Sequence, residues 1–159
     1  MKQLIAALCL FVGISVSVSA QSIIEAAETQ ADLSTFVTAV KAADLVETLS
    51  GEEAVTVFAP SNDAFAALPA GQLESLLMPE NKEQLVKILS YHVIPGKVLS
   101  ADVEDGTSPT VQGEEINVAV ADTGVKINDA NVTTADIEAS NGVVHIIDQV
   151  VMPPSQMKN

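Results

Sequence analysis

The sequence predicts an α+β domain, with helices in its first half and short strands in its second. Apolar residues recur at helical spacing between residues 32 and 92. After Gly96 the chain changes to short apolar runs separated by Gly, Asn and Asp, which is typical of strands and turns. One β-branched run, 54–60, lies within the helical half and is expected to join the later sheet. Helices followed by strands in this order indicate an α+β fold.

Residues 1–20, MKQLIAALCLFVGISVSVSA, are predicted to be a cleaved signal peptide. One lysine precedes an apolar run that ends in the small residues accepted before a cleavage site. The run is short for a bilayer-spanning helix, so we expect no direct membrane insertion after cleavage. The mature chain is then predicted to be secreted, as one domain over residues 21–155 with a frayed tail at 156–159.

Cysteine content and charge narrow the function classes further. Cys9 is the only cysteine and lies in the predicted leader, so the exported protein would contain no thiol. The whole chain has a formal charge of −14, and removal of Lys2 with the leader makes it more acidic. Such a surface repels phosphate backbones and anionic headgroups, which excludes nucleic acid as a partner. The acidity suits either solubility or attraction of cationic partners.

Two short helices are predicted between Asp32 and Leu49. Apolar residues recur there at helical spacing. Asp32 stands where an N-cap belongs, and Gly51 follows as a stop signal. A break within the stretch VKAADLVETL is expected to divide the segment into two helices.

Three further helices are predicted before Gly96. Ser61 or Asn62 can cap a short helix that ends before Pro69. Residues 71–78 form the next pattern, and the last pattern begins at Pro79. The inward face of that last helix is expected to consist of Leu85, Ile88, Leu89 and His92.

The strands have distinct burial patterns. The run AVTVFAP, 54–60, lacks polar alternation and is predicted to be buried on both faces. Later strands are separated by turns at Gln112-Gly113 and Thr123-Gly124, and Asn141-Gly142 is a strong hairpin signal. In GVVHIID, alternation places His145 among apolar neighbours on one face of a strand.

No catalytic, cofactor or metal site is predicted. The chain has no GxSxG and no HExxH or HxxxH, so a nucleophile–base pair and a zinc site lack their usual spacing. A calcium loop starting at Asp102 fails at Thr107 and Gly113, although the acidic surface leaves a weak calcium site open. No glycine loop follows a strand to hold a nucleotide phosphate. Both histidines, His92 and His145, are therefore expected to be buried, hydrogen-bonded core residues, and the chain is predicted not to be an enzyme.

Three segments of the sequence resemble the hallmark segments of the fasciclin domain. They are TVFAPSNDAFAAL (56–68), YHVIPGKV (91–98) and NGVVHIIDQVVMP (141–153), in the family's order and spacing. The resemblance extends over nearly the whole mature chain, and secreted single-domain bacterial fasciclin-like proteins are most similar in architecture. It implies a fasciclin-like fold with a β-sandwich core and several helices packed against it.

The resemblance also implies a function. It indicates a non-enzymatic module for cell adhesion or cell-surface and matrix interaction, whose partner is a protein or polysaccharide. In the family, cell binding has been attributed to positions that correspond here to Tyr91, His92, Asp136 and Ile137. From the residues alone we expect Tyr91 and His92 to serve structure first, and Asp136 to be the more credible contact. The alternative is a periplasmic or extracellular protein that binds a small ligand, for example a hydrophobic molecule held between sheet and helices.

Overall fold

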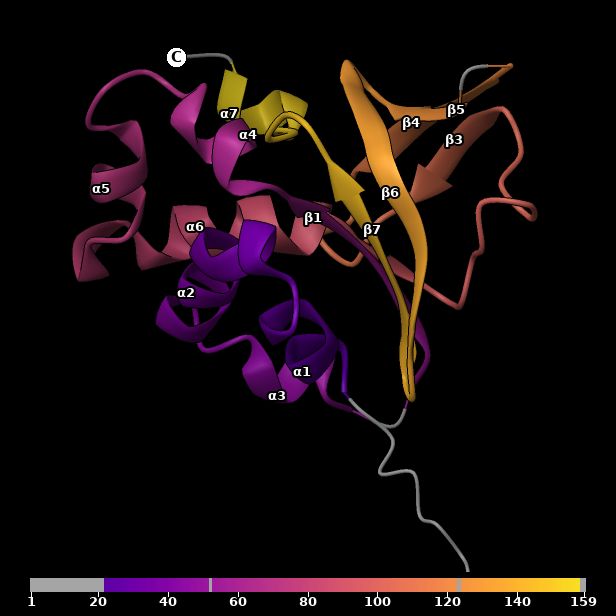
Figure 1. The fold of residues 1–159 in the computed structure, drawn as a ribbon. Helices are drawn as coiled ribbons and strands as arrows, with labels where there is room; N and C mark the ends of the chain where they lie inside the picture. The colour runs from indigo at the N-terminus through magenta and orange to yellow at the C-terminus, as the bar shows by residue number, and fades with distance from the viewer. Residues whose placement is uncertain (1–21, 52, 123, 158–159) are drawn as a thin grey trace, which may run out of the picture.

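The computed structural model describes residues 22–51, 53–122 and 124–157 (Figure 1). The predicted signal peptide lies outside these residues. The helices are short and are concentrated before residue 92. They are α1 (Ile23–Glu28), η2 (Ala31–Leu33), α2 (Ser34–Ala42), α3 (Val46–Leu49), α4 (Asn62–Ala66), α5 (Gln72–Leu76), η3 (Pro79–Asn81), α6 (Lys82–Tyr91) and α7 (Pro154–Met157). The last helix extends two residues beyond the domain end expected at residue 155.

Seven strands form one continuous mixed sheet in the order β2-β1-β7-β6-β5-β4-β3. They are β1 (Val55–Pro60), β2 (Val93–Pro95), β3 (Gly106–Pro109), β4 (Glu115–Ala121), β5 (Gly124–Ile127), β6 (Ala130–Ala139) and β7 (Gly142–Ile147). The sheet bends strongly. As a result, β3, β4 and β5 lie on the opposite side of the molecule from the helices α1–α3 (Figure 1). The Val111 N–H donates to the Val93 carbonyl at 2.9 Å, which brings the two ends of the sheet together. The predicted sandwich is thus a single sheet that nearly closes into a barrel.

The early strand β1 joins the later strands in one sheet, as predicted, and lies between β2 and β7. It pairs with β7 in parallel, beginning at Val55 and Gly142, and with β2 in antiparallel orientation. A Cβ atom on Gly142 would overlap the Val55 carbonyl oxygen. Only glycine permits this approach of the two backbones. The predicted Asn141-Gly142 hairpin is confirmed, since Ala139 pairs with Gly142 across a two-residue turn.

Both faces of β1 and β7 are buried, and each face contributes to a different core. Val57, Val144 and Ile146 pack against the helices in what we call the helical core. Phe58 and Ile147 point to the opposite face and pack against β4 and β5 in what we call the sheet core. Alternate residues of a strand point to opposite faces, so β1 and β7 support both cores at once.

The predicted break between α2 and α3 is confirmed. Asp44 has φ 58°, a left-handed conformation that ends the first helix. The prediction that Asp32 caps α2 is wrong, because Asp32 lies inside the 3-10 turn η2. The cap instead comes from α4: the side-chain oxygen Oδ1 of Asn62 accepts from the Thr35 N–H at 3.0 Å. Ser61 caps α4 as expected, accepting from the Ala64 N–H at 3.2 Å.

Candidate functional site

Tyr91 lies at the end of α6 with its ring in the sheet core and is 1% exposed. Its hydroxyl donates to the Glu115 carbonyl at 3.0 Å. The same oxygen accepts from the Asn128 side-chain amide at 3.0 Å. The ring therefore packs while the hydroxyl joins β4 to the turn between β5 and β6, and the phenol has no free face for a partner.

His92 is 0% exposed, and both ring nitrogens bond to backbone groups. Nδ1–H donates to the Ile88 carbonyl at 2.7 Å, and Nε2 accepts from the Val151 N–H at 3.1 Å. A carbonyl only accepts and an amide N–H only donates, so this network requires the neutral ring with its proton on Nδ1. Burial away from water lowers the pKa of His92 to about 4. His92 is a neutral core residue, as its place on the apolar helix face predicted.

His145 occupies β7 and is also buried. Its Nε2–H donates to the Val98 carbonyl at 2.9 Å, and its Nδ1 accepts from the Asp136 N–H at 3.2 Å. The ring stacks on Phe58 with centroids 5.4 Å apart. Burial lowers the pKa of His145, which favours the neutral ring that this network requires. The second histidine is therefore also a packed, hydrogen-bonded residue.

Asp136 has the opposite environment, with an exposed carboxylate on β6. The strand pairing with β7 is shifted between Thr134 and Ile137, and Asp136 has φ 59° within this bulge. One carboxylate oxygen accepts from the Ser100 N–H at 2.7 Å, and the other accepts from the Ser100 hydroxyl at 2.6 Å. These two bonds lower the pKa of Asp136 and keep it ionised. Ile137 turns inward, half-buried against the helical core.

Three side chains from three strands hold the segment 96–100 on the sheet. The buried Thr56 hydroxyl of β1 donates to the Gly96 carbonyl and accepts from the Val98 N–H, both at 2.7 Å. His145 of β7 holds the Val98 carbonyl, and Asp136 of β6 holds Ser100. The loop that follows β2 is consequently fixed against the bulge, and the Asp136 carboxylate is fixed with it.

The hydrogen bonds of the two histidines go to backbone groups. In the part of the chain that the structure describes, neither imidazole is hydrogen-bonded to a serine or threonine hydroxyl, and both ring nitrogens of each histidine bond to backbone groups. Among the described residues, no group of three His, Asp or Glu side chains could hold a metal ion. The same residues include no helix long and apolar enough to cross a bilayer.

The sequence-predicted site residues are thus divided between two places. Tyr91 and His92 lie together in the interior, whereas Asp136 and Ile137 lie on the bulge of β6. Sequence reasoning missed Ser100, Thr56 and Asn128. Their partners are 36, 40 and 37 residues away in the chain, and no local pattern marks such contacts.

Comparison with known proteins agrees with the hallmark segments. The model of the fasciclin domain matches residues 31–153. The chain belongs to the fasciclin domain family. The family assignment and the α+β fold expected from it are therefore confirmed.

Relatives of this fasciclin chain come from bacteria and animals. Protein sll1483 of Synechocystis sp. is 59% identical over 136 residues, covering 86% of this chain and 76% of the relative. Cell surface glycolipoprotein MPB83 of Mycobacterium bovis is 40% identical, over 71% of this chain and 50% of that protein. Transforming growth factor-beta-induced protein ig-h3 of Sus scrofa is 41% identical, over 77% of this chain but 18% of that protein.

A solved structure supports the fold. A FAS1 domain pair from the insect cell adhesion molecule Fasciclin I superposes with a TM-score of 0.73 over 85% of this chain and 52% of that one. Sequence identity across this match is 18%, so the match concerns the fold alone.

Proposed function

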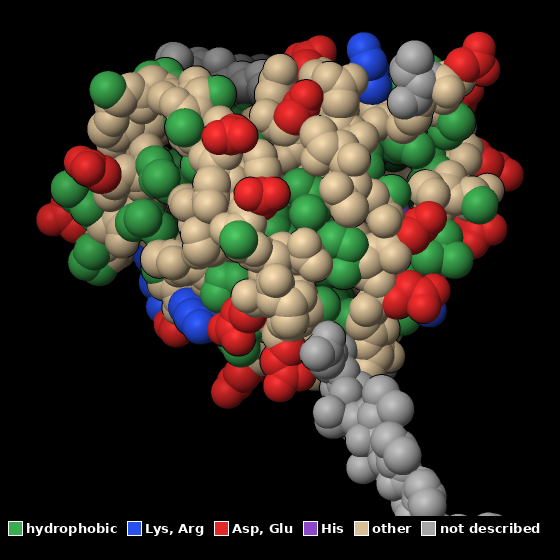
Figure 2. Space-filling model, in the orientation of Figure 1, with side chains coloured by type: hydrophobic (Ala, Val, Ile, Leu, Met, Phe, Trp, Pro, Cys, Tyr) green, Lys and Arg blue, Asp and Glu red, His purple; other side chains and the backbone are tan. Residues whose placement is uncertain are grey.

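We propose that this fasciclin domain is a secreted, non-enzymatic module that attaches to a cell-surface or matrix protein or polysaccharide. Two similar proteins bear names that describe a cell-surface glycolipoprotein and a cell adhesion molecule. The acidic side chains scattered over the face in Figure 2 favour a partner that presents cationic or neutral groups.

The exposed carboxylate of Asp136 is the observation that carries the proposal. An ionised carboxylate has about four lone-pair positions, and Ser100 occupies two of them. The remaining positions face solvent and can accept from a lysine, arginine or hydroxyl of a partner. The bulge and the Ser100 bonds already hold the group in place, so binding would cost little side-chain entropy.

The histidines support a binding role over a catalytic one. A general base must have a lone pair within reach of the substrate proton. In His92 and His145 the accepting nitrogens already take backbone N–H groups, at 3.1 and 3.2 Å. Releasing the His92 nitrogen would leave the buried Val151 N–H unpaired, which costs about 1–3 kcal/mol.

The alternative is a small-ligand carrier, for example with a hydrophobic molecule held in a closed pocket between sheet and helices, and the enclosed space of the sheet core gives it no support. The apolar space lined by Phe58, Val103, Val125, Val132 and His145 is too narrow to admit a water molecule. Packed side chains fill this region, so a buried ligand would have to displace them.

A paired measurement on Asp136→Asn tests the proposal. Asparagine keeps the shape, tolerates positive φ and removes the charge, so the free energy of unfolding should fall by about 1 kcal/mol or less. Beads coated with the variant should bind poorly to cells of the organism that produces the protein. Asp63→Asn, an exposed carboxylate on α4, is the control and should attach normally. Normal attachment by Asp136→Asn would refute a contact role for this carboxylate.

His92→Ala separates structure from recognition in the Tyr91-His92 pair. The substitution leaves a cavity and an unpaired Val151 N–H, which should cost about 1–3 kcal/mol. Attachment should fall only in proportion to the unfolded fraction. A variant that melts like the wild type but does not attach would show that the pair serves recognition and not only stability.

A further inference from the structure

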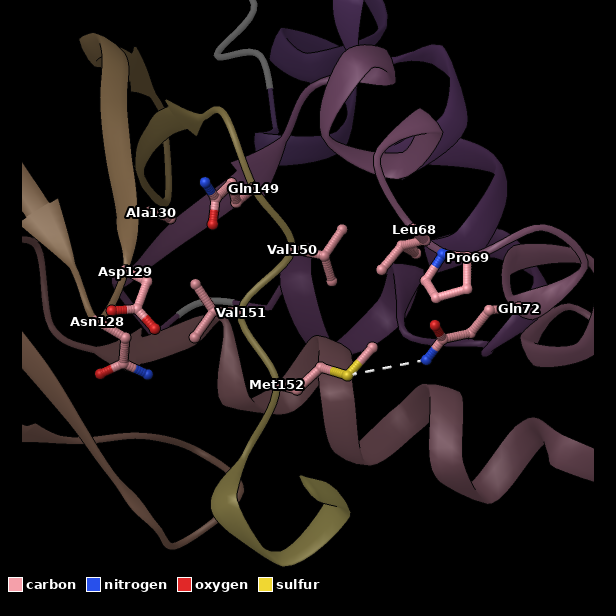
Figure 3. Close-up of a pocket in the computed structure, with 10 residues that line it drawn as sticks. All are labelled: Leu68, Pro69, Gln72, Asn128, Asp129, Ala130, Gln149, Val150, Val151 and Met152. Atoms are coloured by element: carbon pink, nitrogen blue, oxygen red, sulfur yellow. Dashed lines mark hydrogen bonds between the residues drawn. The ribbon is translucent and has the colours of Figure 1, made fainter. Parts of the chain in front are cut away.

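The Tyr91-His92 pair lies directly beneath an open hollow of about 310 Å³. The segment 149–152 forms its floor between two walls, the β5–β6 turn at 128–130 and the α4–α5 connection at 68–72 (Figure 3). Tyr91 binds the side-chain amide of Asn128 in the first wall at 3.0 Å. His92 binds the backbone N–H of Val151 in the floor at 3.1 Å. The two buried residues therefore hold two parts of the hollow in place from below.

We infer that this hollow is a second binding site, which takes an aliphatic side chain from an extended, neutral or basic segment of a partner protein. Tyr91 and His92 are positioning residues for it, although neither reaches its surface. The hollow shares no lining residue with the Asp136 bulge, so the inference does not rest on the attachment role proposed for that carboxylate.

The lining chemistry selects this occupant. The floor and one wall supply apolar surface from Leu68, Pro69, Val150, Val151 and Met152. A volume of about 310 Å³ is at the low end for ligand sites, which suits one side chain better than a folded element. The lining has no aromatic ring on which a sugar could stack.

The polar rim matches a peptide backbone. Gln72, Asn128 and Gln149 line the hollow. The Asn128 amide is held by Tyr91 and by the Asn117 N–H, whereas the Gln72 and Gln149 amides offer donors and an acceptor, as a peptide unit requires. The Gln72 amide lies 3.9 Å from the Met152 sulfur (Figure 3), a weak contact that a better partner can replace. The charged group of the lining is the exposed Asp129 carboxylate. Together with the formal charge of −14, it disfavours an acidic segment and favours a basic one.

NMR titration of the ¹⁵N-labelled protein, expressed from the full-length sequence, tests this site. The probe is the peptide acetyl-Gly-Ser-Leu-Lys-Gly-amide at millimolar concentration. The side-chain NH₂ signals of Gln72, Asn128 and Gln149 should shift and saturate. A peptide with alanine in place of leucine should bind about fivefold more weakly or worse, since it buries less apolar surface. Replacing the lysine by aspartate should also weaken binding.

Protein variants separate the lining from the residues beneath it. Met152→Ala should weaken peptide binding, whereas Val86→Ala on α6, which does not line the hollow, should leave it unchanged. Tyr91→Phe keeps the ring but releases Asn128, so it should weaken binding even where the melting temperature is unchanged. If Tyr91→Phe does not fold, Asn128→Gly tests the same bond, because glycine accepts the φ of 53° found there.

Several results would overturn the inference. Absence of shifts at 10 mM peptide, or equal shifts with the alanine peptide, would exclude the aliphatic anchor. Shifts with 3-methyl-1-butanol but with no peptide would make the hollow a small-molecule site. Wild-type affinity in folded Tyr91→Phe and Asn128→Gly would refute the positioning role.

Discussion

Acidification should destabilise the domain through His92. The pKa of this buried ring is about 4 in the folded protein, against 6.5 for an unperturbed histidine. Between these values the unfolded chain binds a proton that the folded chain excludes. The free energy of unfolding therefore has its full value with respect to His92 above about pH 6.5, and it decreases as the pH falls towards 4. The linkage relation gives a loss of about 2 kcal/mol at pH 5 and about 3 kcal/mol at pH 4.

Urea unfolding of the wild type and of His92→Gln at pH 7, 6, 5 and 4 measures this loss. Glutamine has similar length and cannot titrate, and its oxygen can accept from the Val151 N–H. Effects of His145 and of the many carboxylates are common to both proteins, so they cancel in the difference between the two curves. The wild type should lose about 3 kcal/mol more than the variant between pH 7 and pH 4. Parallel curves would refute the conclusion that His92 is buried as a neutral ring.

Three further outcomes are expected. Gly142→Ala should destabilise the domain by about 4 kcal/mol or more, because the added Cβ would overlap the β1 backbone. In the same urea titration Gly51→Ala, whose added Cβ would make ordinary contacts, should lower the free energy of unfolding by less than about 1 kcal/mol. Asn141→Asp should lower the free energy of unfolding by about 3 kcal/mol at neutral pH, because a carboxylate would face the two carbonyls that the amide now binds. The exposed control Asn117→Asp should melt nearly normally, and equal melting of the two variants would contradict the role of the Asn141 amide. Protein recovered from the periplasm or medium should begin at Gln21 and contain no thiol by intact-mass analysis, and a retained leader would show the export prediction to be wrong.

The parts of the fold that follow local periodicity could be predicted from the sequence. The burial of β1 on both faces, the Asn141-Gly142 hairpin and the inward face of α6 all depend on residues that are neighbours in the chain. The burial of His92 and His145 was predicted for the same reason. Each lies in register with apolar neighbours, which fixes the face that it shares.

The contacts that organise the site could not be predicted in this way. Asn62 replaces Asp32 at the start of α2 because α4 packs there, a contact across 27 residues. The bond of His92 to Val151 spans 59 residues. The sequence around Asp136 predicts a polar stretch. The bulge that holds Asp136 depends instead on the register of β6 against β7, which local sequence does not show. Tertiary packing, rather than local sequence, decides these partners.

A deletion strain scored for attachment tests the proposed adhesion role most directly. Loss of the protein should reduce attachment, and re-expression of the wild-type chain should restore it. Re-expression of Asp136→Asn at the same level should not restore it, although that variant should fold. Normal attachment by the deletion strain, or full rescue by Asp136→Asn, would contradict an attachment role that depends on the exposed carboxylate.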